Sequence, residues 1–189
     1  MLERWVEAVR FLTGEQCQAL TKGLGIDCRG PVSAHRAAKR LKVFDASYTS
    51  RIANGPEVAE ALIGHIGEYE TCLVWACRLP WGDLSPEDEP PADWKRFRDW
   101  RRRRAEWRNL HDAPGHLFGS DERAELAELI EWALYMGWDA LIAAAPGEGA
   151  VLLSHDDCIR ICARGTPDVL IRRLERLGLR AERRRPAEA

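Results

Sequence analysis

Apolar residues recur at helical spacing over much of the chain, beginning at the N-terminus. The first predicted helix has a rough apolar stripe formed by Trp5, Val6, Val9, Phe11 and Leu12. Thr13 and Gln16 have the spacing of a capping box, which predicts a second helix that ends at Gly23 or Gly25. We therefore expect a helical N-terminal segment.

Further helices are predicted where a capping residue precedes apolar residues at helical spacing. Ser33 is a cap for a helix that reaches Lys42, and Asp45 is a cap for one that reaches Asn54. Gly55-Pro56-Glu57 opens the next helix, because proline is well tolerated in a first helical turn. Later helices are expected at 92–110, from a Ser120 cap to about Met136, and from Thr166-Pro167-Asp168 to about Leu177.

Four short apolar runs predict strands: residues 70–79, 139–145, 150–154 and 158–164. Gly147-Glu148-Gly149 joins two of them as in a hairpin. The expected fold class is therefore α+β, with a helical N-terminal segment followed by a small, mostly antiparallel sheet of about four strands packed with helices.

The composition along the chain suggests where it divides. The proline-rich acidic stretch 80–93 is the best boundary signal. We expect a helical segment at 1–69, an α+β domain at 70–180 that contains 80–93 as a loop, and a flexible tail at 181–189. If the strand at 70–79 joins the C-terminal strands, the whole chain is one co-folded unit.

Bulk properties restrict the function classes. The net charge of −2 argues against a generally basic nucleic-acid coat protein. No apolar run reaches about 18 residues, and Glu3 and Glu7 interrupt the N-terminal apolar stretch, so we expect neither a membrane span nor a secretory signal. Six cysteines without a C-x-x-C pair favour reduced, structural thiols in a cytoplasmic protein.

Residues 34–55 carry the most specific local pattern. Ala38, Leu41 and Val43 match the first half of a repressor-type helix-turn-helix, and residues 50–55 resemble the second half, with one extra residue in the turn. This segment thus resembles that family, which places its second helix in the DNA major groove. The resemblance implies a DNA-contacting set of Arg36, Lys39, Arg40, Ser47, Thr49, Ser50 and Arg51. The alternative is an ordinary helical hairpin with a solvated basic face.

A second charged segment, residues 92–110, interleaves arginines with Trp94, Phe97, Trp100 and Trp107. Such a pattern is found in proteins that stack on RNA or single-stranded bases. The alternative is an amphipathic helix whose aromatic stripe packs on the sheet while its arginines pair with acidic segments of the same chain.

Histidine and aspartate at predicted turns form the third candidate site. His111, His116, His155 and Asp156 have the side-chain types used for Zn²⁺ binding or for general acid–base catalysis. Their spacing matches no standard ligand motif, and the main nucleotide-binding and hydrolase motifs are absent from the sequence. We therefore assign no catalytic residue, no metal and no cofactor, and keep these four only as weak catalytic candidates.

These patterns favour a non-enzymatic cytoplasmic binding or regulatory protein without a membrane partner. The most specific version binds duplex DNA through residues 34–55, and a homodimer of this kind would read two half-sites. One alternative is a protein-binding accessory factor that uses the charged helices or a tryptophan such as Trp81. The other is a metal-dependent or acid–base enzyme built on the His/Asp residues.

Overall fold

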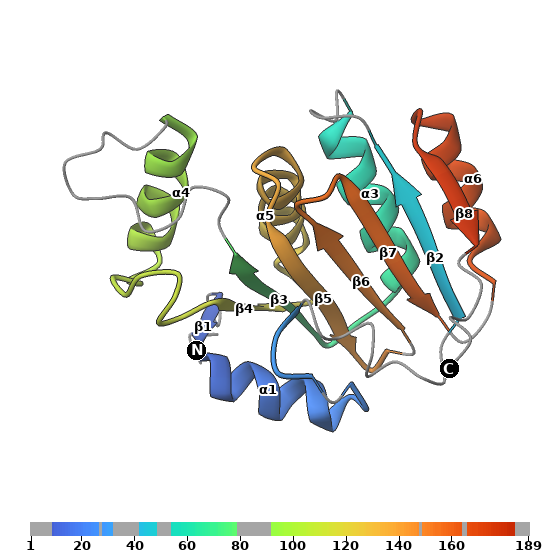
Figure 1. Cartoon of the computed structure of the whole chain (residues 1–189). Helices are drawn as coiled ribbons and strands as arrows, with labels where there is room; N and C mark the ends of the chain where they lie inside the picture. The colour runs from blue at the N-terminus through green and yellow to red at the C-terminus, as the bar shows by residue number, and fades with distance from the viewer. Residues whose placement is uncertain are drawn as a thin grey trace, which may run out of the picture.

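The computed structural model describes residues 9–26, 28–31, 42–48, 54–78, 92–147, 149–163 and 166–183 (Figure 1). The described helices are α1 (Gly14–Gly23), α3 (Gly55–Ile66), α4 (Ala92–Arg103), α5 (Arg123–Tyr135) and α6 (Asp168–Arg176). The described strands are β1 (Arg10–Leu12), β2 (Lys42–Ser47), β3 (Thr71–Arg78), β4 (Gly115–Gly119), β5 (Asp139–Ala145), β6 (Gly149–Ser154), β7 (Cys158–Ala163) and β8 (Arg180–Arg183).

All of these strands join one antiparallel sheet with the order β1-β4-β3-β5-β6-β7-β2-β8. Strands far apart in the sequence are neighbours in it: β1 pairs with β4 at one edge, and β2 lies between β7 and β8 near the other. The first 69 residues therefore contribute strands to the same sheet as the C-terminal half.

The expected fold class is wrong in two respects, although the chain does mix helices and strands. The sheet has eight described strands instead of about four, and the N-terminal segment supplies β1 and β2 as well as helices. The four predicted strands correspond to β3, β5, β6 and β7, whose apolar runs are long enough to recognise. Of the other four, β1, β4 and β8 are shorter, and β2 carries the charged residues Lys42 and Asp45, so tertiary pairing and not local pattern determines them.

Strand β2 occupies residues for which the sequence predicts a helix end, a turn and a helix start. Its side chains alternate: Phe44 and Ala46 are buried in the main core, whereas Val43 and Asp45 face the other side of the sheet. Asp45 receives two hydrogen bonds from Arg160 on β7, at 2.7 and 3.0 Å. The two-residue period and this cross-strand ion pair specify a strand.

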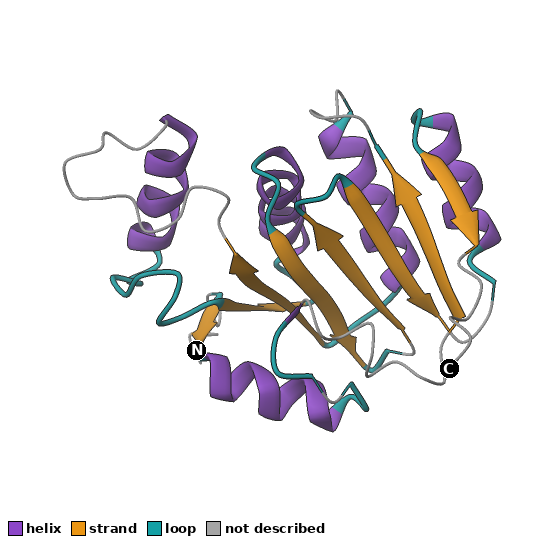
Figure 2. Ribbon diagram, viewed as in Figure 1, coloured by secondary structure: helices purple, strands orange, loops and turns teal. Residues whose placement is uncertain are grey.

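Helices pack on both faces of the sheet, as Figure 2 shows. The main core lies between the sheet and α3, α5 and α6, and α4 adds Phe97 and Trp100 to it. On the opposite face, α1 and the residues after it cover Leu73, Trp75 and Leu141 with Cys17 and Ile26. Within the described ranges, no helix combines the length and the apolarity needed to cross a bilayer.

Several helix boundaries agree with the sequence signals. Thr13 and Gln16 form the expected capping box at the start of α1, with the Thr13 N–H donating to Gln16 Oε1 at 2.8 Å. α3 begins at Gly55-Pro56, and α6 begins directly after Pro167. The exceptions are α4, which ends at Arg103 instead of 110, and α5, which begins at Arg123 and not at Ser120.

Strand β8 occupies the start of the predicted tail, and residues 184–189 lie outside the described residues.

Candidate functional site

The structure does not bring the three candidate histidines together. His116 is fully buried in β4, His111 is exposed in the loop before β4, and His155 lies in the turn between β6 and β7. Among the residues that the structure describes, no group of three or more His, Cys, Asp or Glu side chains is placed to hold a metal ion. The predicted His/Asp constellation is therefore not a single site.

His116 belongs to an aromatic cluster. Its ring lies 5.3 Å from the Phe11 ring centroid and 5.9 Å from that of Phe97. Burial, helped by the nearby positive charge of Arg101, lowers the pKa of His116 to about 3. The imidazole is therefore neutral in the folded protein at physiological pH, and its role is in packing.

The burial of His116 predicts that the stability of the protein depends on pH. The pKa of His116 is 6.5 in the unfolded chain and about 3 in the folded protein, so the unfolded chain binds this proton more readily. The free energy of unfolding is therefore at its full value above pH 6.5 and decreases as the pH falls toward 3. Between pH 7 and pH 5 the unfolding free energy should drop by about 2 kcal/mol through this group alone. Urea unfolding of the wild type and of His116→Leu at both pH values measures it, and an equal drop in the two proteins would contradict the assignment.

His155 has one buried partner that sequence reasoning missed. Asp139, at the start of β5, accepts a hydrogen bond from the His155 backbone N–H at 3.1 Å, and both its carboxylate oxygens lie 2.9 Å from Nδ1. The other ring nitrogen, Nε2, lies 3.4 Å from Asp156 Oδ1. Nothing in the sequence links Asp139 to His155, because only the pairing of β5 with β6 brings them together.

The DNA-contacting residues fall mostly outside the described part of the chain. Ser47 is at the end of β2, where its hydroxyl donates to the Arg180 carbonyl at 3.3 Å. The other six members of the set, Arg36, Lys39, Arg40, Thr49, Ser50 and Arg51, lie outside the described residues. DNA binding by this segment therefore stays a prediction.

The aromatic stripe of α4 packs inward, as the second interpretation of the Arg/Trp segment predicts. Phe97 and Trp100 are buried, Trp94 is half-buried, and Phe97 lies 4.7 Å from Trp138 and 5.6 Å from Trp132 between ring centroids. Two arginines also pair with acidic residues of α5, as expected: Arg96 with Glu128 at 3.9 Å and Arg104 with Glu125 at 3.7 Å. These contacts fix α4 against the rest of the fold.

Trp107 differs from the other tryptophans that the structure describes because it is largely exposed to solvent. Its side chain is 75% exposed, whereas Trp75, Trp100, Trp132 and Trp138 are buried. The Arg102 guanidinium carbon lies 5.9 Å from the centroid of the Trp107 ring. A large aromatic side chain presented to solvent next to arginine is the combination that dominates binding energy at protein interfaces.

A left-handed residue directs the chain toward Trp107. Ala105 has φ 60°, and the N–H groups of Ala105 and Glu106 donate to the carbonyls of Arg102 and Arg101. This is a Schellman motif with alanine at the position where glycine is usual. A left-handed alanine costs about 1 kcal/mol, so other contacts of the loop have to hold it in place.

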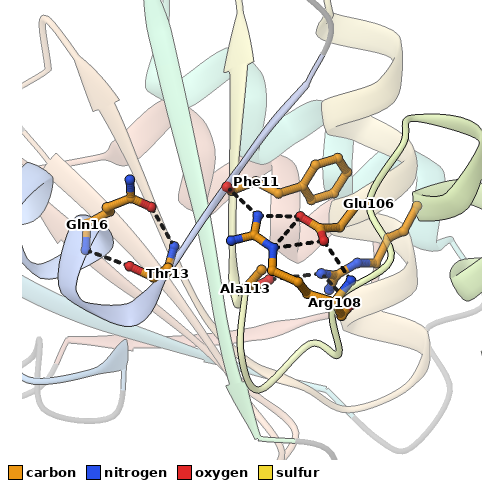
Figure 3. A network of polar contacts seen from close by, with 7 residues as sticks. Phe11, Thr13, Gln16, Glu106, Arg108 and Ala113 are labelled. Carbon is orange, nitrogen blue, oxygen red and sulfur yellow. Dashed lines mark hydrogen bonds and ion pairs between the residues drawn. The ribbon is translucent and has the colours of Figure 1, made fainter.

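A polar network provides those contacts (Figure 3). The buried Glu106 carboxylate accepts hydrogen bonds from the Arg108 backbone N–H at 2.8 Å and from its Nε at 2.9 Å. Arg108 Nη2 donates to the Phe11 carbonyl, and the buried Arg101 donates to the Ala113 carbonyl. Burial alone raises the pKa of Glu106, but the bonds from Arg108 hold that pKa below its usual value, so the carboxylate is charged.

The exposed face of α4 beside Trp107 is basic. Lys95 donates to Asp99 at 2.7 Å, and Arg102 lies 3.7 Å from the same carboxylate. Arg98 is exposed one helical turn from Lys95. We call Lys95, Arg98, Asp99, Arg102 and Trp107 the α4 patch: three cations and one anion along α4, with the exposed Trp107 ring beside Arg102.

Comparison with protein-family models, with curated proteins and with solved structures finds no match in any of the three.

Proposed function

We propose that this chain is a non-enzymatic binding protein that holds an acidic partner protein against the α4 patch. The observation that carries the proposal is the exposure of Trp107 on a loop whose neighbouring residues are fixed by buried polar contacts. Contact of this large apolar side chain with water is unfavourable in the free protein. Burial against a partner removes that apolar area from water.

The rigid loop strengthens this argument. Glu106 and Arg108, on either side of Trp107, are bonded to each other, to β1 and to the end of α4. The backbone around Trp107 is therefore ordered before any partner arrives. Association then costs less conformational entropy than it would for a flexible loop, which is the usual benefit of a preorganised anchor.

Charge supports an acidic partner. Lys95 and Arg102 keep 69% and 52% of their side-chain area exposed, and they share the single carboxylate of Asp99. The positive surplus of the α4 patch favours a partner surface rich in Asp and Glu and repels basic ones. Buried thiols at Cys17, Cys28, Cys72 and Cys162 support a reducing compartment such as the cytoplasm.

Capture of partners after nuclease digestion tests the proposal. The immobilised wild type, Trp107→Ala and Tyr135→Ala should be compared, since Tyr135 is another exposed aromatic, 52% exposed at the end of α5. We expect an acidic protein on the wild type and on Tyr135→Ala, and its loss from Trp107→Ala. A set of captured proteins that is the same for all three variants would contradict the proposal, and binding that disappears on nuclease treatment would indicate a nucleic-acid partner instead.

A further inference from the structure

A second feature, independent of the α4 patch, lies in the turn between β6 and β7. Asp139 begins β5 and His155 follows the last residue of β6, and the register pairs Ala140 with Leu153. The two side chains therefore meet at the same end of adjacent strands. Only 5% of the Asp139 side chain is exposed, against 36% for His155.

The contacts of Asp139 select one tautomer of the neutral imidazole. With both carboxylate oxygens 2.9 Å from Nδ1, the proton of the neutral ring is on Nδ1, and Nε2 keeps its lone pair. This lone pair is on the Asp156 side of the ring. A buried carboxylate that orients a histidine from behind is the arrangement that supports metal-binding histidines in proteins.

The distance on the Nε2 side fits a tetrahedral ion. His155 Nε2 and Asp156 Oδ1 are 3.4 Å apart. Two ligands bonded at about 2.0–2.2 Å in a tetrahedral Zn²⁺ site are separated by about 3.4 Å. Octahedral Mg²⁺, with bonds of about 2.1 Å, needs adjacent ligands only about 3.0 Å apart and prefers oxygen. We propose that His155 and Asp156, supported by Asp139, bind a Zn²⁺-type divalent ion.

The exposure of the site would let a bound ion exchange with solvent. The Asp156 side chain is 78% exposed, so the ion is reached directly from solvent. Within the described ranges no third protein ligand is close, which leaves two tetrahedral positions for water or for a group from a bound molecule. Such a site is open, unlike the closed four-ligand sites that hold structural zinc.

Titration with Co²⁺, followed by its visible absorption, and competition by Zn²⁺ test this inference on the whole chain. The comparison uses the wild type, His155→Ala and His111→Ala, because His111 is a second exposed histidine that belongs to no proposed site. We expect one saturable Co²⁺ site that Zn²⁺ displaces, unchanged in His111→Ala and at least about tenfold weaker in His155→Ala. Asp139→Asn should weaken binding by about 10–100-fold, the usual effect of removing such a supporting carboxylate.

Folding is checked separately by thermal unfolding of each variant without metal. If Asp139→Asn does not fold, Asp156→Asn replaces it, since that side chain is mostly exposed. Equal affinity in the wild type and His155→Ala would overturn the inference, as would binding that does not saturate below millimolar Co²⁺. An intense near-ultraviolet thiolate–cobalt band would assign the ion to cysteines and would also overturn it.

Discussion

Replacing Phe97 with alanine should lower the free energy of unfolding by about 3–5 kcal/mol. Phe97 is fully buried, and its ring lies 4.7 Å from Trp138, 5.6 Å from Trp132 and 6.1 Å from Trp100 between centroids. Alanine leaves a cavity between α4, α5 and the sheet, and large aromatic neighbours cannot close it. This loss is a large part of the roughly 5–15 kcal/mol that stabilises a typical domain.

Urea unfolding, followed by circular dichroism, measures this effect. Arg98→Ala is the matched control, because it lies next to Phe97 in α4 but is exposed. We expect the control to change stability by less than about 0.5 kcal/mol. A loss below about 1 kcal/mol for Phe97→Ala would mean that α4 is not packed on the fold as described, since a fully buried aromatic ring costs several times more to remove.

Replacing Glu106 with glutamine should cost about 2–3 kcal/mol, since a buried Arg101 then loses its nearby carboxylate and Arg108 loses its ion pair. Breaking an ion pair costs more when both partners are buried. Here the Arg108 side chain is 45% exposed, and water screens part of its charge. The loop should also open locally, because the Arg108 amide no longer donates to a charged acceptor.

Two measurements separate these effects. Urea unfolding gives the global cost, and hydrogen exchange of the Arg108 amide should become faster than in the wild type. Glu128→Gln is the control, since the Arg96–Glu128 contact is 3.9 Å long and Arg96 is 68% exposed. We expect this control to cost less than about 0.5 kcal/mol. Equal stability and equal exchange in Glu106→Gln and the wild type would show that the network does not fix the loop.

The elements predicted correctly are those with strong local signals. The capping box at Thr13 and Gln16 and the Pro56 start are specified by residues within one turn of the helix. Long apolar runs likewise identified β3, β5, β6 and β7. Strand β2 replaces the predicted turn between two helices, a prediction that arises because Ala38, Leu41 and Val43 also fit a helical pattern. Its pairing with β7 and β8 joins residues more than a hundred positions apart, and no local pattern records that.

The sites show the same division between local and long-range information. The aromatic stripe of α4 is visible at helical spacing, but the sequence does not show that Trp107 lies beyond the end of the helix at Arg103. Ala105 hides this boundary, since glycine is the usual signal for a left-handed helix end. Asp139 and His155 likewise meet only through the register of β5 and β6.

Isothermal titration calorimetry with the captured partner, once purified, tests whether Trp107 anchors an interface. The wild type, Trp107→Ala and Tyr135→Ala are titrated with the same partner preparation. We expect Trp107→Ala to bind at least about 30-fold more weakly, equivalent to about 2 kcal/mol, while Tyr135→Ala binds like the wild type. Equal affinity of Trp107→Ala and the wild type would contradict this expectation.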